Sequence, residues 1–120
     1  MPLALHRFPF QAMGSPCEIQ LFAPDESVAR AGAEHAIADI ARLEARYSRY
    51  REDSLLSQIN RIAAQGGSIE VDDETASLLN YAATCHAESN GLFDITSGIL
   101  RRAWRFNQER LPTPAEARAY

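Results

Sequence analysis

The chain has 120 residues, of which 46% are apolar and 23% are charged. This length suits one ordinary domain with its own core, and the composition disfavours disordered, collagen-like and coiled-coil proteins. All 12 basic residues are arginine, and 16 acidic residues bring the net charge to −4, which argues against nucleic acid or an anionic membrane surface as a partner.

Residues 3–22 alternate between apolar and polar side chains on either side of a break at residues 13–16. This alternation predicts a β-hairpin whose turn lies at the break. Pro9 has no N–H for a β-ladder, so the first strand should lie at a sheet edge or contain a bulge. The apolar positions of the hairpin are His6, Phe8, Phe10, Cys17, Ile19 and Leu21.

A long helix is predicted next, capped by Asp25 or Ser27 and ending near Tyr50. Its apolar residues recur at spacings of three and four, which is typical of one helix face. Alanine lines the first half of this face, so another element can approach closely there. The face comprises Ala29, Ala33, Ala36, Ile40, Leu43 and Tyr47.

Shorter elements follow in the second half of the chain. Asp53 or Ser54 caps a helix that ends at glycines 66 and 67, and residues 69–71 alternate as a short strand. A further helix starts at Asp72 and Asp73 and ends at residues 90–91. Residues 93–95 are expected to be extended, and a short helix capped by Thr96 or Ser97 follows them.

Residues 113–116 combine a threonine N-cap, a proline at the first helical position and a glutamate three residues after the cap. This combination predicts the start of a new helix, but too few residues follow to form a stable one. We therefore expect the chain to be part of a longer protein. The alternative is a frayed tail at a true C-terminus.

No run approaches the roughly 18 to 20 apolar residues that a membrane-spanning helix needs. The apolar residues before His6 are too few for a secretory signal, which predicts a cytoplasmic protein. Cys17 and Cys85 lie far apart and match no disulfide or zinc pattern, so we expect two buried free thiols.

Two segments are candidates for ligand binding. Residues 89–98 run from a helix end to a helix start, where Asp94 either caps the helix or accepts hydrogen bonds from a ligand. Residues 47–51 alternate aromatic and guanidinium groups, on which a flat aromatic ligand could stack. Tyr47 continues the apolar face and belongs in the core, whereas the role of Tyr50, beyond the helix end, stays open.

Other chemistries find no support in the sequence. The three histidines are isolated, and no His, Cys, Asp or Glu group has metal-ligand spacing, so we predict no metal site within the chain. Asp72 and Asp73 resemble a catalytic carboxylate pair but stand where a helix needs its cap. No catalytic residue is assigned.

Three segments together resemble the FAD:protein FMN transferases, the ApbE-like flavin transferases once described as thiamine-biosynthesis lipoproteins. Residues 13–15 (Met-Gly-Ser) are similar to the family's Met-Gly-Thr, and residues 48–54 to its Ser-x-Tyr-x-x-Asp-Ser. Residues 91–100 and the later Trp104 are similar to Gly-Ala-Phe/Met-Asp-Ile-Thr-Val-Gly-Pro-Leu and its tryptophan. Ser15, Asn90 and Ile99 depart from the family pattern at positions without a flavin contact.

The resemblance implies a flavin site. Members of that family use magnesium to split FAD and attach FMN to a Thr or Ser hydroxyl of an acceptor protein. Tyr50 then corresponds to the tyrosine that stacks on the flavin and Met13 to a residue lining its pocket. Leu92, Phe93 and Asp94 correspond to a stretch that contacts FAD.

The same resemblance implies which parts of the site lie elsewhere. The magnesium ligands are expected beyond residue 120, so the chain alone should be catalytically incomplete. Since family members are often exported lipoproteins, a periplasmic or membrane-anchored location is the alternative to the cytoplasm if a leader has been removed.

The sequence as a whole predicts an α+β fold, in which one long helix and several shorter ones pack on a small, mainly antiparallel sheet with an N-terminal hairpin. Residues 1–120 are expected to form the N-terminal portion of an ApbE-like flavin transferase domain. The rival functions are a non-catalytic flavin-binding protein and a structural module that forms homo-oligomers through the unfinished helix.

Overall fold

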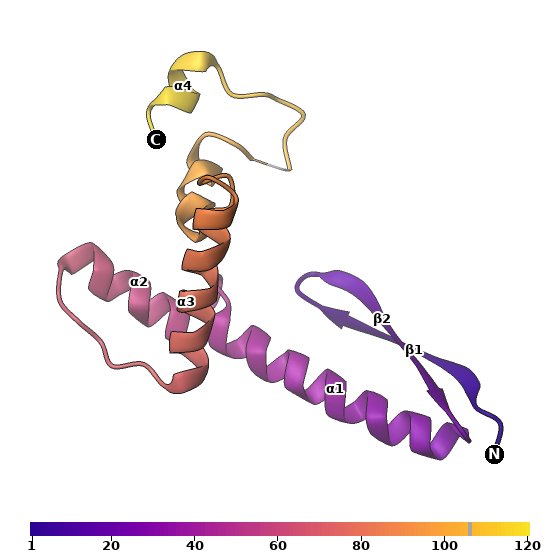
Figure 1. The fold of residues 1–120 in the computed structure, drawn as a ribbon. Helices are drawn as coiled ribbons and strands as arrows, with labels where there is room; N and C mark the ends of the chain where they lie inside the picture. Colours follow the sequence, from indigo (N-terminus) through magenta and orange to yellow (C-terminus); the bar gives the residue numbers. More distant parts are fainter. Residues whose placement is uncertain (106) are drawn as a thin grey trace. The chain divides into compact units, whose positions relative to one another are not determined.

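The computed structural model describes residues 1–105 and 107–120. Its elements confirm the predicted α+β class, with an N-terminal antiparallel hairpin followed by one long helix and shorter ones (Figure 1). The chain divides into two compact units, Met1–Ile69 and Glu70–Tyr120. Each unit is described by itself.

The hairpin consists of β1 (Ala4–Ala12) and β2 (Ser15–Ala23). Their register pairs Ala4 with Ala23 and Ala12 with Ser15. The two turn residues, Met13 and Gly14, have φ angles of 54° and 68°, and positive φ at both central positions is typical of tight two-residue hairpin turns. The register continues across Pro9 without a bulge, so the edge-strand prediction is confirmed.

The long helix α1 (Glu26–Tyr47) begins after Asp25, whose side chain accepts a 2.9 Å hydrogen bond from the N–H of Val28. Asp25 is therefore the cap and Ser27 is not. The helix ends three residues earlier than expected, because Ser48 is already extended with ψ of 127°. Tyr50 consequently lies in a loop, as predicted.

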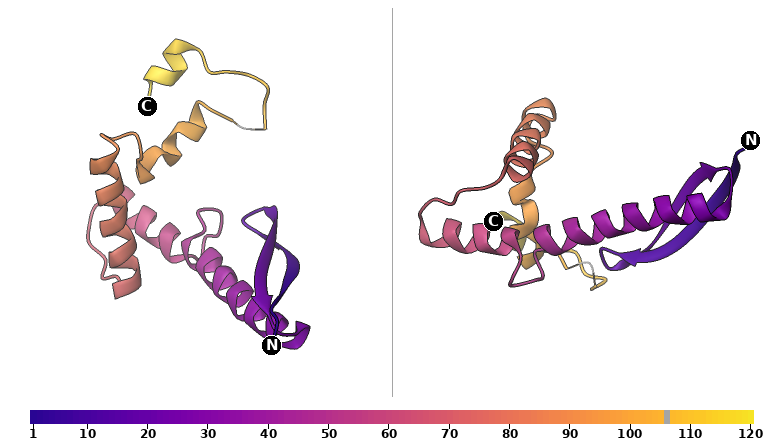
Figure 2. Two further views of the ribbon diagram at one scale, coloured as in Figure 1. Left: turned by 45° about the vertical axis from the view of Figure 1, so that its right-hand side comes forward. Right: turned by 90° about the horizontal axis from the view of Figure 1, so that it is seen from below.

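The first half of α1 packs against the hairpin, as its alanines predict. Ala29 and Ala33 are fully buried, and a Cβ added at Gly32 would lie 3.3 Å from Cδ1 of Leu21 on β2. Figure 2 shows this helix running beside the ribbon within the first unit. Small side chains thus bring the helix backbone close to the strands.

The core is smaller than the composition predicts. Among the described residues, the buried apolar side chains are Ala12, Ala23, Ala29 and Ala33. The alternating apolar residues of the hairpin and both cysteine thiols are only half-buried, which corrects the prediction of buried thiols. The physical reason is that a two-stranded ribbon covered by one helix offers little interior.

The first unit ends with α2 (Leu55–Gln65) and a non-regular segment. Ser54 caps α2 by accepting from the N–H of Ser57 at 3.0 Å, and Gly66, with φ of 77°, follows its last turn. The predicted strand at residues 69–71 is wrong, since residues 66–72 form neither strand nor helix. Alternating apolar residues become a strand only where a partner completes the ladder.

The second unit begins with α3 (Asp73–Glu88), which Asp72 caps by accepting from the N–H of Thr75 at 3.2 Å. At the other end, Gly91 N–H donates to His86 O at 2.8 Å and Asn90 N–H to Ala87 O at 3.1 Å. With φ of 53° at Asn90, this is a Schellman ending. Both predicted boundaries of this helix are confirmed.

A 3₁₀ helix, η1 (Ile95–Arg102), follows, and its cap is Asp94. The predicted caps Thr96 and Ser97 are therefore wrong. Asp94 is extended, as predicted, with φ of −144° and ψ of 115°, but Ile95 is already helical, so the extended stretch ends one residue earlier than expected. The reason is that the Asp94 carboxylate accepts from the Thr96 N–H at 2.8 Å and so caps the helix before Thr96 or Ser97 can.

The last element is α4 (Pro114–Arg118), with the predicted capping box between Thr113 and Glu116. No helix in the described part of the chain is both long and apolar enough to cross a bilayer.

Candidate functional site

The loop of residues 48–53, here called the tyrosine loop, carries the first candidate ligand contact. The Tyr50 ring in this loop is 78% exposed. The Arg49 guanidinium carbon lies 5.6 Å from the centroid of that ring, close enough for a cation–π contact on one face. Tyr47, by contrast, is half-buried at the helix end. The tyrosine loop therefore exposes one aromatic ring to solvent.

A two-pronged ion pair stands beside Tyr50 in the tyrosine loop. Arg51 donates to both carboxylate oxygens of Asp53, with N···O distances of 3.1 and 3.0 Å. These hydrogen bonds lower the pKa of Asp53 and raise that of Arg51, to which the charge of Glu44 also contributes. The pair holds two charged side chains of the tyrosine loop in one arrangement.

Met13 reaches the same end of α1 as the tyrosine loop. Its backbone N–H donates a 2.8 Å hydrogen bond to Oε1 of Glu44, and its side chain is 70% exposed. Glu44 lies in the last turns of α1, directly before the loop that holds Tyr50. The first unit thus brings two of the predicted flavin contacts to one end of one helix.

Asp94 belongs to the second unit and caps η1. Its Oδ1 accepts from the N–H of Thr96 at 2.8 Å and from the Thr96 hydroxyl at 2.6 Å. The other oxygen, Oδ2, lies 4.0 Å from Nε2 of His86. The bonds from Thr96, with a smaller contribution from His86, hold the pKa of Asp94 below its ordinary value of 3.8. The capping interpretation is confirmed, and Oδ2 faces a second potential donor.

Leu92 and Phe93 lie in the turn that links α3 to Asp94. The side chain of Leu92 is 92% exposed and that of Phe93 is 48% exposed. The turn is ordered by a 2.8 Å hydrogen bond from the Phe93 N–H to the Ser89 hydroxyl. Large apolar side chains beside a carboxylate suit a ligand with a flat ring and polar edges.

Two partners of these residues were not predicted from the sequence. Glu44 binds the Met13 amide across 31 positions of sequence, and nothing in the helical pattern distinguishes it from other exposed charges. His86, which the sequence predicts to be isolated, lies 4.0 Å from Asp94 Oδ2. A signal for His86 did exist, since a glycine ending of α3 turns the chain back toward the last helical turn.

A groove of about 660 Å³ lies apart from these residues, between β1 and the first half of α1. It is lined by Leu5, His6, Phe8, Arg30, Ile37 and their neighbours, and contains none of the predicted site residues. Nε2 of His6 is buried there without a hydrogen-bond partner within residues 1–105 and 107–120. The groove therefore lies outside the candidate flavin site.

The described residues do not form a metal centre. No group of three or more His, Cys, Asp or Glu side chains could hold an ion in the ranges 1–105 and 107–120. The residues present therefore do not fit magnesium, and no chemical step is assigned to a metal here.

The hairpin, the long helix and the shorter helices define an α+β fold. The chain belongs to the ApbE family, which matches residues 13–120. The comparison with curated proteins gave no match.

Solved structures support this assignment. The chain is 26% identical to the ApbE protein of Thermotoga maritima, with a TM-score of 0.75 over 94% of this chain and 37% of that one. It is 26% identical to the apo flavinyl transferase ApbE of Pseudomonas stutzeri, with a TM-score of 0.71 over 99% and 39%. It is 24% identical to the flavin transferase ApbE of Vibrio cholerae, with a TM-score of 0.68 over 98% of this chain and 40% of that one. The chain thus spans about two fifths of the length of these proteins.

Proposed function

We propose that this chain supplies the flavin-positioning part of a flavin transferase, which moves FMN from FAD to a Thr or Ser hydroxyl of an acceptor protein. The observation that carries the proposal is the exposed ring of Tyr50, held at the same end of α1 as Met13. Family membership supports the same function.

Each predicted residue has a physical role in this proposal. In the first unit, Tyr50 stacks on the isoalloxazine ring, and the exposed side chain of Met13 offers it an apolar contact. In the second unit, Leu92 and Phe93 offer apolar contacts to FAD, and the carboxylate of Asp94 accepts hydrogen bonds from a ring nitrogen or from hydroxyl groups of FAD. These contacts hold FAD in place, which is how they lower the barrier of the reaction.

In the proposed reaction, the acceptor hydroxyl oxygen forms a bond to the FMN phosphorus and the pyrophosphate bond to AMP breaks. The hydroxyl proton passes to solvent and AMP leaves. No residue of this chain is assigned to that proton or to the leaving group, so the chain's own contribution is binding and orientation. Magnesium, FAD and an acceptor protein are the partners that this function requires.

Titration of a fixed concentration of FAD with the purified protein tests the proposal. A stacked tyrosine should quench flavin fluorescence, so the signal should fall along a saturable curve. If the fluorescence instead falls in proportion to the protein concentration and does not reach a plateau, the proposed flavin site is wrong.

A further inference from the structure

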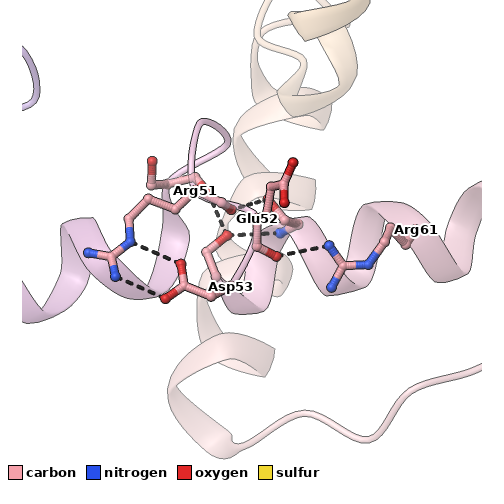
Figure 3. A network of polar contacts seen from close by, with 7 residues as sticks. Arg51, Glu52, Asp53 and Arg61 are labelled. Atoms are coloured by element: carbon pink, nitrogen blue, oxygen red, sulfur yellow. Dashed lines mark hydrogen bonds and ion pairs between the residues drawn. The ribbon is translucent and has the colours of Figure 1, made fainter.

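The tyrosine loop is attached to the start of α2 by its backbone carbonyl groups. The Ser54 hydroxyl donates to Ser48 O at 2.6 Å and the Ser57 hydroxyl donates to Arg51 O at 2.6 Å. Nη1 of Arg61 donates to Glu52 O at 2.9 Å. Figure 3 shows Arg61 reaching back from its helix toward Glu52, beside the Arg51–Asp53 pair. Three carbonyls of one short loop are therefore held by α2 and its N-cap residue.

These bonds go beyond what capping of α2 requires. A helix start needs acceptors for its free N–H groups, and Ser54 already provides one by accepting from the Ser57 N–H at 3.0 Å. The hydroxyl of Ser57 and the guanidinium of Arg61 instead donate to carbonyls of the preceding loop. They contribute nothing to the unpaired N–H groups of α2, so their effect falls on the loop.

The held carbonyls lie on both sides of Tyr50. Ser48 and Arg51 flank it, and the Tyr50 N–H itself donates to the Ser48 hydroxyl at 3.2 Å. Ser54, which is only 3% exposed, connects Ser48 to the first turn of α2. The backbone on either side of Tyr50 is thus held by hydrogen bonds, whereas the Tyr50 side chain is largely exposed to solvent.

We propose that Ser57 and Arg61, together with Ser54, are positioning residues that hold the tyrosine loop in one conformation and so aim the Tyr50 ring before the ligand arrives. A loop ordered in advance loses less conformational entropy on binding. The ligand is the flavin ring, and in this respect the inference rests on the proposed function.

Amide hydrogen exchange tests the holding of the loop without any ligand. In the double variant Ser57→Ala/Arg61→Ala, the Tyr50 and Ser54 amides should exchange at least about fivefold faster than in the unchanged protein. Ser77→Ala, at an exposed serine of α3, is the control and should leave both rates unchanged. Equal rates in the double variant and the unchanged protein would overturn the inference.

FAD affinity tests whether the held loop acts through Tyr50. The double variant should weaken FAD binding by about 3- to 10-fold, but should add no further loss in a Tyr50→Ala background. An equal loss in both backgrounds would show that Ser57 and Arg61 act elsewhere and would overturn the inference. Faster exchange in a protein that binds no FAD would support the holding of the loop and refute the proposed function.

Discussion

The backbone amide of Met13, in the hairpin turn, donates a 2.8 Å hydrogen bond to the carboxylate of Glu44 in the last turns of α1. The bond joins two residues that are 31 positions apart in the sequence. It connects the turn of the hairpin to the end of α1, which directly precedes the loop with Tyr50. This bond therefore attaches the hairpin turn to the helix that leads directly into the tyrosine loop.

We predict that Glu44→Ala lowers the free energy of unfolding by about 1 kcal/mol, the usual net contribution of such a hydrogen bond. Glu44→Gln should lose less than half of that, because the amide oxygen still accepts from Met13. Urea denaturation of the two variants measures the difference. Equal stability of Glu44→Ala and the unchanged protein would show that water replaces the bond without loss.

Asp94 should make the stability of the second unit depend on pH in the acidic range. Its pKa is held below 3.8 by the bonds from Thr96 and by His86, so the unfolded chain binds that proton more readily than the folded one. The carboxylate therefore stabilises the fold above pH of about 4 and loses this contribution as the pH falls through its lowered pKa.

The variant Asp94→Asn tests this pH dependence, since it should show a smaller loss of urea resistance between about pH 7 and about pH 3 than the unchanged protein. Asp73→Asn, in the first turn of α3, is the matched control. Parallel pH curves for the unchanged protein and Asp94→Asn would contradict the prediction.

Glu116 provides a second titration with a defined midpoint. Two-pronged hydrogen bonds from Arg110, with the N–H and hydroxyl of Thr113, lower its pKa from 4.5 to about 2. NMR titration of its carboxyl carbon should therefore find a midpoint near that value. Because the pKa is lowered, the capping box of α4 should persist as the pH falls through 4.5 and open near 2. In Arg110→Ala the midpoint should rise toward 4.5, and an unchanged midpoint would refute the assigned cause.

Gly32→Ala tests the close approach of α1 to the hairpin. Alanine favours the helix by about 1 kcal/mol over glycine, but the new Cβ would lie 3.3 Å from Cδ1 of Leu21. Since that atom ends a flexible side chain, we predict a net stabilisation of about 0.5 kcal/mol. In a Leu21→Ala background the gain should approach the full propensity difference. A loss of stability in the single variant would show that Leu21 cannot move.

The local elements were predictable because their signals are local. The hairpin turn at residues 13–14, the Ser54 and Asp72 caps and the glycine ending after α3 each follow from side-chain chemistry within a few residues. The Thr113–Glu116 capping box is of the same kind. Signals of this sort need no knowledge of the tertiary structure.

The failures have a different cause. Residues 69–71 alternate like a strand, but no other segment within residues 1–105 and 107–120 pairs with them. Asp94 caps η1 in place of the predicted caps Thr96 and Ser97, because its carboxylate lies closer to the start of the helix. The contacts of Met13 with Glu44 and of Arg61 with Glu52 join residues that no periodicity relates, so the support of the candidate site appears only in the folded chain.

FAD titration of Tyr50→Ala is the most direct test of the central claim, which is that this exposed ring binds a flavin. Loss of stacking should weaken FAD affinity by about 1 to 2 kcal/mol, or about 5- to 30-fold. Tyr81→Ala, at an exposed tyrosine of α3, should leave the affinity unchanged. If Tyr50→Ala binds FAD as tightly as the unchanged protein does, the flavin site proposed here is wrong.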